Sequence, residues 1–131
     1  MKILLDTHFV LWSATDPGRI TDKERLILSD SDADVYISSV SIWELRIKWN
    51  SLSRKGEVPF DFDPIHVLAY WQHMNVKFVD LSPQLAVAVL KQALPHKDPF
   101  DQILVILAQE IGARILTRDD DILTHPLAIA A

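Results

Sequence analysis

The stretch that decides the fold is residues 2–12, KILLDTHFVLW, in which one acidic residue joins an apolar run to a helix-like run. Ile3–Leu5 is continuously apolar, which is typical of a strand covered on both faces of a parallel sheet. Thr7–Ala14 is expected to form a short helix, because the Pro and Gly of the following TDPGR end helices readily. Asp6 is therefore either the cap of this helix or the first acid of a functional site.

Strands and helices are expected to alternate along the rest of the chain. Further strands are predicted at Val35–Ser38, Val76–Leu81 and Arg114–Thr117, with a short edge strand in LAIA at 127–130. Helices are predicted to begin at the capping box Thr21/Glu24, at the similar spacing Ser41/Glu44, at Asp63-Pro64, at Ser82-Pro83 (ending before Pro95) and at Asp98-Pro99 (ending at Gly112). This order predicts an α/β domain with a mostly parallel sheet of four to five strands, and two helices between residues 41 and 74 that project from it.

Composition sets the broad class of the protein. With 131 residues, of which 49% are apolar, the chain is expected to form one domain over residues 1–131. There is no cysteine, which excludes disulfides and thiolate metal sites and favours a cytoplasmic location. No apolar run reaches the length of a membrane span. The net charge of −5 argues against a protein that coats nucleic acid through bulk charge.

Acidic residues follow several of the predicted strands. Asp6 follows the first strand, Glu44 lies early in the helix after the second, Asp98 and Asp101 begin a later helix, and Asp119 follows the fourth strand. The carboxyl ends of parallel strands share one edge of a sheet, which is where such folds bind ligands. Each acid alone is explained at least as well by helix capping. Together they would repel one another in one cleft, so a cation is expected among them.

The chemistry of the acids favours a hard metal ion. The five histidines show no paired ligand spacing, so zinc is improbable, whereas carboxylate oxygens suit Mg²⁺ or Mn²⁺. One or two such ions can activate water and neutralise charge in phosphodiester hydrolysis. Thr7, Ser39 and Thr117 stand beside the acids and could orient them, although each is equally well a polar strand end.

Four segments in order, LLDTHFVLW, VYISSVSIWELRIK, HKDPFDQILVILAQ and ILTRDD, resemble the PIN-domain ribonucleases, specifically the VapC-type toxins of toxin-antitoxin modules. The resemblance implies a three-layer α/β/α sandwich whose acidic pocket binds Mg²⁺ or Mn²⁺ and cuts single-stranded RNA. By motif position it assigns Asp6, Glu44 and Asp119 to the metal site. Of the two acids in DPFD, Asp101 is the expected ligand and Asp98 the helix cap or a secondary contact.

The resemblance also implies partners. A small antitoxin is expected to occupy a groove and block the site, and a homodimer is expected. The helical pair bearing Trp43, Trp49 and Trp71 is a plausible surface for both contacts, although tryptophans at such positions are more often core. Arg46, Lys48 and Arg118 are first guesses for contacts to RNA phosphates. The chain departs from the family at Gln102, where an Arg is common, and this affects substrate preference more than the reaction.

Three other functions are compatible with an acid at the end of the first strand, and each makes its own demand on the sequence. A phosphatase with Asp6 as nucleophile would need a second Asp two residues on, where the chain has His8. A receiver-like phosphoacceptor would need a Lys after a late strand, where the chain has Arg118. A catalytically silent domain that only binds RNA or an antitoxin is the alternative that the sequence leaves open, and metal titration would separate it from the nuclease.

Overall fold

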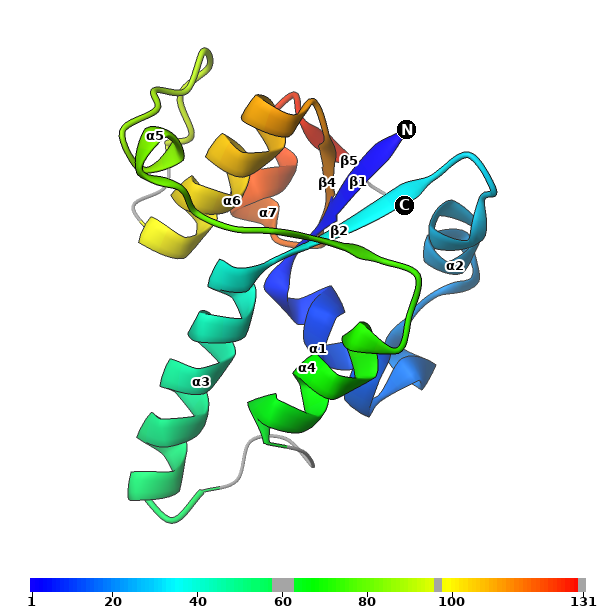
Figure 1. Ribbon diagram of the computed structural model, residues 1–131, viewed down its shortest axis with the longest axis vertical. Helices are drawn as coiled ribbons and strands as arrows, with labels where there is room; N and C mark the ends of the chain where they lie inside the picture. The colour runs from blue at the N-terminus through cyan, green and yellow to red at the C-terminus, as the bar shows by residue number, and fades with distance from the viewer. Residues whose placement is uncertain (58–62, 96–97, 130–131) are drawn as a thin grey trace.

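The computed structural model describes residues 1–57, 63–95 and 98–129, and a parallel sheet runs through its centre (Figure 1). All neighbouring strands pair in parallel. In spatial order the strands of the described residues are β3 (Lys77–Val79), β2 (Asp34–Ser38), β1 (Lys2–Leu5), β4 (Arg114–Leu116) and β5 (Ala128–Ile129). The predicted parallel α/β fold is confirmed, and so is the short edge strand in LAIA, whose last residue, Ala130, lies outside the described residues.

Helices cover both faces of the sheet. They are α1 (Thr7–Thr15), the 3₁₀ turn η1 (Pro17–Arg19), α2 (Asp22–Ser29), α3 (Ser39–Arg54), α4 (Pro64–Gln72), α5 (Pro83–Ala86), α6 (Pro99–Ile111) and α7 (Asp120–Leu123). Together with the sheet they form the predicted three-layer α/β/α sandwich. Within the described ranges, no helix is both long and apolar enough to cross a membrane.

The side chains of β1 alternate between two hydrophobic cores. Ile3 and Leu5 pack with residues of α1, α3 and α4, whereas Leu4 packs on the other face with residues of α6 and α7. All three are at most 1% exposed. A strand buried on both faces cannot show an apolar–polar alternation, which explains the continuous apolar run in the sequence. Its end, at Asp6, is consequently enclosed by both layers.

The helices α3 and α4 form the projecting pair that was predicted (Figure 1). They pack on each other and on α1. Trp71 is 6% exposed and its indole N–H donates to the carbonyl of Val10 at 2.9 Å, so it belongs to the core. Trp43 is 59% exposed, so the tryptophans of the pair have different roles.

The predicted start of α3 was wrong. Ser41 and Glu44 do not form a capping box, because the helix begins at Ser39 and its N-cap is Ser38, whose hydroxyl accepts from the N–H of Val40 at 3.0 Å. The strand β2 passes directly into α3, so the last hydroxyl of the strand becomes the cap. This frees the side chains of Ser41 and Glu44 for other contacts.

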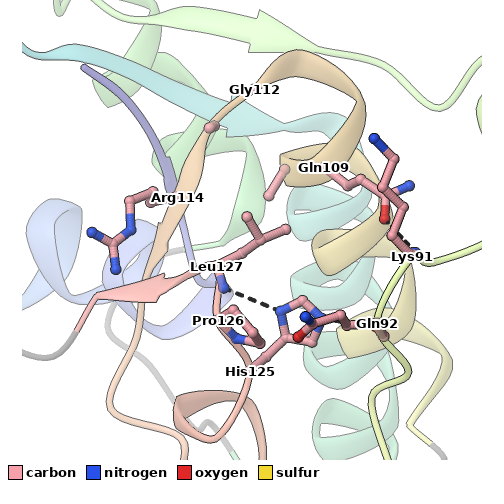
Figure 2. A pocket seen from close by; sticks show the side chains of 10 residues that line it. Lys91, Gln92, Gln109, Gly112, Arg114, His125, Pro126 and Leu127 are labelled. Atoms are coloured by element: carbon pink, nitrogen blue, oxygen red, sulfur yellow. Dashed lines mark hydrogen bonds between the residues drawn. The ribbon is translucent and has the colours of Figure 1, made fainter.

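The helix predicted from Pro83 to before Pro95 ends at Ala86. We call residues 87–95 the strap. Gln109 of α6 donates to the carbonyl of Val89 at 3.0 Å and accepts from the N–H of Lys91 at 2.7 Å (Figure 2), while Gln102 donates to the carbonyl of Leu94 at 3.0 Å. These amides take the place of helical hydrogen bonds. The preceding strand is also shorter than predicted, since β3 spans only Lys77–Val79.

Candidate active site

Asp6 lies where β1 ends and α1 begins, and both of its carboxylate oxygens are engaged. Oδ1 accepts from the N–H of His8 at 3.4 Å, which makes Asp6 the N-cap of α1. Oδ2 accepts from the hydroxyl of Thr117 at 2.6 Å. The residue is 4% exposed. Asp6 is therefore a helix cap and also a buried acid held by the residue that follows β4, so the two interpretations of the sequence are compatible.

Asp119 lies after the end of β4, the strand that pairs with β1. It is the N-cap of α7, where its Oδ1 accepts from the N–H of Asp121 at 2.9 Å. Its own N–H donates to Oγ1 of Thr117 at 3.0 Å. The hydroxyl of Thr117 thus links the backbone of Asp119 to the carboxylate of Asp6.

The electrostatics of Asp6 are those of an acid that lacks a strong counter-charge. Burial raises the pKa of the Asp6 carboxyl above the usual aspartate range, and the nearby charge of Asp119 raises this pKa further. The hydrogen bond from Thr117 and the attraction of His8, whose Nδ1 lies 4.0 Å from Oδ1, act in the opposite direction. A cation between Asp6 and Asp119 would remove the repulsion and favour the ionised form.

Glu44 is brought to the residue that follows Asp6. Thr7 donates through Oγ1 to Glu44 Oε1 at 2.8 Å, and the same hydroxyl lies 3.0 Å from Oγ of Ser41. The other Glu44 oxygen, Oε2, lies 2.7 Å from the Nζ of Lys48. Glu44 is 6% exposed. The hydroxyl of Thr7 therefore orients the acid of α3, in parallel with Thr117 and Asp6, while Ser39 is the first, half-buried residue of α3.

The first acid of DPFD, Asp98, is the helix cap that the sequence predicted. This residue is the N-cap of α6, and its Oδ1 accepts from the N–H of Phe100 at 2.9 Å. Asp101 lies in the first turn and is 7% exposed, on a helix that packs against α3. His96 and Lys97, which precede DPFD in the quoted motif, lie outside the described residues.

The basic residues proposed to contact RNA phosphates are each paired with a carboxylate. Arg46 lies 2.6 Å from Asp63, and Lys48 lies 2.7 Å from Glu44. Arg118 lies on the carboxylate of Glu24, with Nε to Oε2 at 2.7 Å. Of these, Lys48 contacts a predicted metal ligand directly.

From the sequence, Glu24 is predicted only as a capping residue. It does form the predicted capping box with Thr21, yet its buried carboxylate also binds Arg118, which is 94 residues away along the chain. The guanidinium carbon of Arg118 lies 4.7 Å from the centroid of the Trp12 ring. The spacing of nearby residues cannot predict a contact between residues so far apart in the chain. The only indication in the sequence was that Arg118, a charged residue, lies at a strand end beside the predicted ligand Asp119.

The donor set fits a hard cation, but it is not preassembled as a cage. Among residues 1–57, 63–95 and 98–129, no three carboxylate or imidazole side chains are grouped so that they could hold a metal ion. The geometry nevertheless joins Asp6 to Asp119 through Thr117, and joins Glu44 to Thr7 beside Asp6. Carboxylate oxygens without sulfur or paired imidazoles match Mg²⁺ or Mn²⁺ chemistry.

A separate cavity of about 370 Å³ contains none of these acids (Figure 2). It lies between the strap, the end of α6 and the His125–Leu127 turn. The His125 ring accepts from the N–H of Leu127 at 3.2 Å and lies 2.9 Å from the carbonyl of Gln92. With Nδ1 accepting, Nε2 must carry the proton and donate to that carbonyl. His125 is thus a structural residue of this wall.

Comparison with known proteins shows which proteins the chain resembles. Residues 3–126 match the model of the PIN domain family. The chain is 26% identical over 128 residues to Ribonuclease VapC22 of Mycobacterium tuberculosis, covering 94% of this chain and 91% of that protein. Its fold is similar to that in the crystal structure of VapBC2 from Rickettsia felis bound to a DNA fragment from their promoter, with a TM-score of 0.64, 14% identity, and coverage of 98% of this chain and 96% of that one.

Proposed function

Because the chain belongs to the PIN domain family, we propose that it is a metal-dependent endoribonuclease that acts as the toxin of a type II toxin-antitoxin system. The observation that carries the proposal is that buried Asp6 and half-buried Asp119 are linked by Thr117 at the carboxyl edge of the sheet, because its hydroxyl donates to the Asp6 carboxylate and accepts from the Asp119 N–H. A PIN domain that retains such a pair has the acids that phosphodiester hydrolysis with a divalent ion requires. The likeness to a protein named a ribonuclease supports RNA as the substrate.

We assign Asp6, Glu44, Asp101 and Asp119 to hold Mg²⁺ or Mn²⁺, with Asp98 as a secondary contact. When bound, such an ion supplies positive charge to the phosphate and lowers the pKa of water. The chain's own residues prepare the acids for this task. Thr117 fixes one oxygen of Asp6, and Thr7 fixes one oxygen of Glu44, so neither acid has to be ordered when substrate arrives.

Lys48 is suited to exchange between two partners. Its ammonium group lies 2.7 Å from Glu44, and its side chain is 47% exposed. A lysine at the edge of an acidic site can leave a carboxylate when a metal ion takes that carboxylate, and it can then contact an RNA phosphate. Arg46 and Arg118 are held more firmly by their own carboxylates, so we rank Lys48 first among the three.

We propose two protein partners as well. One is an antitoxin, since the similar solved structure is of VapBC2, and the other is a second copy of the chain. The exposed Trp43 on α3 offers apolar area for either contact. The cytoplasm is the location we expect, because the substrate would be cellular RNA and the chain has no cysteine.

The test is cleavage of a defined RNA pool with Mn²⁺, with and without EDTA, and mapping of the cut sites. The wild type should cut only with the ion, and Asp6→Asn should lose cleavage while remaining folded. Asp120→Asn is the matched control, because Asp120 is exposed and only one residue from Asp119. Full activity in a folded Asp6→Asn protein would refute the assignment.

The alternative is a silent PIN domain that binds RNA or an antitoxin without cutting. Two observations favour it. Glu44 already has Lys48 as its counter-ion, and no three acids are grouped for a metal in the part of the chain that the structure describes. Calorimetric titration with Mn²⁺ separates the two functions. Binding that disappears in Asp6→Asn supports the nuclease, and an intact protein that takes up no ion supports the silent domain.

A further inference from the structure

One face of α1 carries two stacked rings beside the acidic site, and two arginines from outside this helix lie against them. The His8 ring lies on the Trp12 ring with a centroid distance of 5.4 Å and an interplanar angle of 26°. The guanidinium carbons of Arg118 and Arg19 lie 4.7 Å and 5.6 Å from the Trp12 centroid. We call His8, Trp12, Arg19 and Arg118 the stacking track.

The track starts beside the predicted metal ligands. The Nδ1 atom of His8 lies 4.0 Å from Oδ1 of Asp6. Arg118 directly precedes Asp119 in the chain. A ligand that binds at the acids would therefore lie next to His8.

The exposure of His8 is what distinguishes it from a core aromatic. Its side chain is 54% exposed, whereas its neighbours Thr7 and Phe9 are buried. One face of the imidazole lies on Trp12, so the exposed area includes the opposite face. Trp12 in turn packs edge-on against Phe9, with centroids 5.6 Å apart, so the platform beneath His8 is anchored in the core.

The two guanidinium groups of the track are held in place by carboxylates. Arg118 is held by Glu24, and Arg19 by Asp16 at 3.0 Å. These pairs keep the guanidinium groups over the Trp12 ring. Rings and guanidinium planes of this kind are what unstacked bases of single-stranded RNA bind to, without a need for a particular base.

We propose that the stacking track binds a base of single-stranded RNA, with the base on the outer face of His8 and its phosphate directed toward the acids. This inference rests on the proposed function, because it takes RNA as the substrate. It adds a substrate contact that the metal ligands cannot supply, since carboxylates repel the RNA backbone. His8 thereby becomes a binding residue, although its spacing indicates no metal ligation.

The experiment compares two RNA probes in EDTA, where no cleavage occurs. Fluorescence anisotropy measures binding of a labelled ten-nucleotide oligoadenylate and of the same backbone without bases. In His8→Ala, affinity for the oligoadenylate should fall roughly tenfold, and affinity for the abasic strand should stay unchanged. His8→Phe should restore most of the loss because a phenyl ring also stacks. His73→Ala is the control, since His73 is an exposed histidine at the end of α4.

Either of two results would overturn the inference: equal affinity of wild type and His8→Ala for oligoadenylate, or an equal loss for both probes, which would indicate charge rather than stacking. Failure of this inference can also be told apart from failure of the proposed function. Base-dependent binding without any cleavage in Mn²⁺ would refute the nuclease and retain the track. Cleavage with unchanged binding in His8→Ala would do the reverse.

Discussion

At the scale of single residues, Asp6 is a proposed metal ligand whose burial lowers the stability of the fold. Its carboxylate caps α1 and accepts from Thr117, yet burial and the charge of Asp119 raise its pKa. When the pKa of a carboxyl is higher in the folded state than in the unfolded state, the free energy of unfolding falls as the pH rises through those two values. At neutral pH the ionised Asp6 is therefore a destabilising group unless a cation is bound.

Asp6→Asn should consequently be more stable than the wild type at pH 7 in metal-free buffer. The amide keeps one oxygen that accepts from the His8 N–H, and its NH2 group can donate to Oγ1 of Thr117 in place of the bond that Asp6 accepts from it. The change also removes the charge that burial penalises. Urea denaturation at pH 7 measures the difference, which should shrink at acid pH, where Asp6 is protonated in both states. Asp120→Asn, at an exposed position, serves as the control. A lower unfolding free energy for Asp6→Asn at pH 7 would contradict this account.

Glu24 has the opposite electrostatic character. The hydrogen bond from Arg118 lowers the pKa of the Glu24 carboxyl, against the effect of burial, and the amide N–H of Thr21 lowers it further. A lowered pKa in the folded state contributes stability that is present above the ordinary glutamate pKa and is lost as the pH falls through the folded-state value. The pair should thus stabilise the protein at neutral pH and stop doing so in acid.

Glu24→Gln should lower the free energy of unfolding at pH 7 by about 1–2 kcal/mol, because charge-assisted hydrogen bonds contribute up to about 3 kcal/mol and solvent around the partly exposed Arg118 weakens this one. Urea denaturation at several pH values is the measurement. The difference from wild type should decrease toward acid pH. Asp22→Asn is the matched control, since its carboxylate pairs with Arg25 while 98% exposed. A constant difference across the pH range would argue against the ion pair as its cause.

At the scale of elements, the sequence predicts helix starts better than helix lengths. The starts at Asp63-Pro64 and Asp98-Pro99 were found because an N-cap and an N1 proline act on their own helix within one turn. The strap was missed because its hydrogen bonds come from Gln109 and Gln102 of α6, which lie 8–20 residues further along the chain. An apolar period alone cannot report a competing partner of this kind.

The same reasoning applies to the candidate site. Parallel pairing brings strand ends to one edge, so the meeting of Asp6 with Asp119 could be predicted from the order of elements. The contact of Thr7 with Glu44 could not, because it depends on α3 beginning at Ser39 rather than Ser41. A shift of two residues rotates a helix by more than half a turn and decides which side chains face the site.

Gln109→Ala should release the strap from α6. The change removes the acceptor for the Lys91 N–H (Figure 2). It also removes the donor for the Val89 carbonyl. We expect faster hydrogen exchange at the Lys91 amide and a loss of about 1–2 kcal/mol in unfolding free energy, at about 1 kcal/mol for each hydrogen bond. Gln84→Ala, at an exposed position of α5, is the control. Unchanged exchange at Lys91 would show that other contacts hold the strap.

At the scale of the whole molecule, the candidate site lies where the two helical layers meet at the edge of the sheet. The sheet divides the interior into two cores, with α1, α3 and α4 on one side and α6 and α7 on the other. The proposed ligands come from both sides: Asp6 and Glu44 from the first layer, and Asp101 and Asp119 from the second. A cation bound by all of them would tie the layers together at the edge of the sheet.

A divalent ion should therefore stabilise the entire domain. At an Mn²⁺ concentration of one hundred times its Kd, the expected gain in unfolding free energy is about 2.7 kcal/mol, from the ligand's preference for the folded state. Thermal unfolding followed by circular dichroism, with Mn²⁺ and then with excess EDTA, measures the gain and its reversal. Asp6→Asn should begin at a higher melting temperature than wild type and gain little from Mn²⁺, so the order of the two proteins reverses when the ion is added. An equal rise in melting temperature with Mn²⁺ in both proteins would place the ion at a site that does not include Asp6. Binding of the ion would then not be the reason that the chain has a buried acid with a raised pKa at this position.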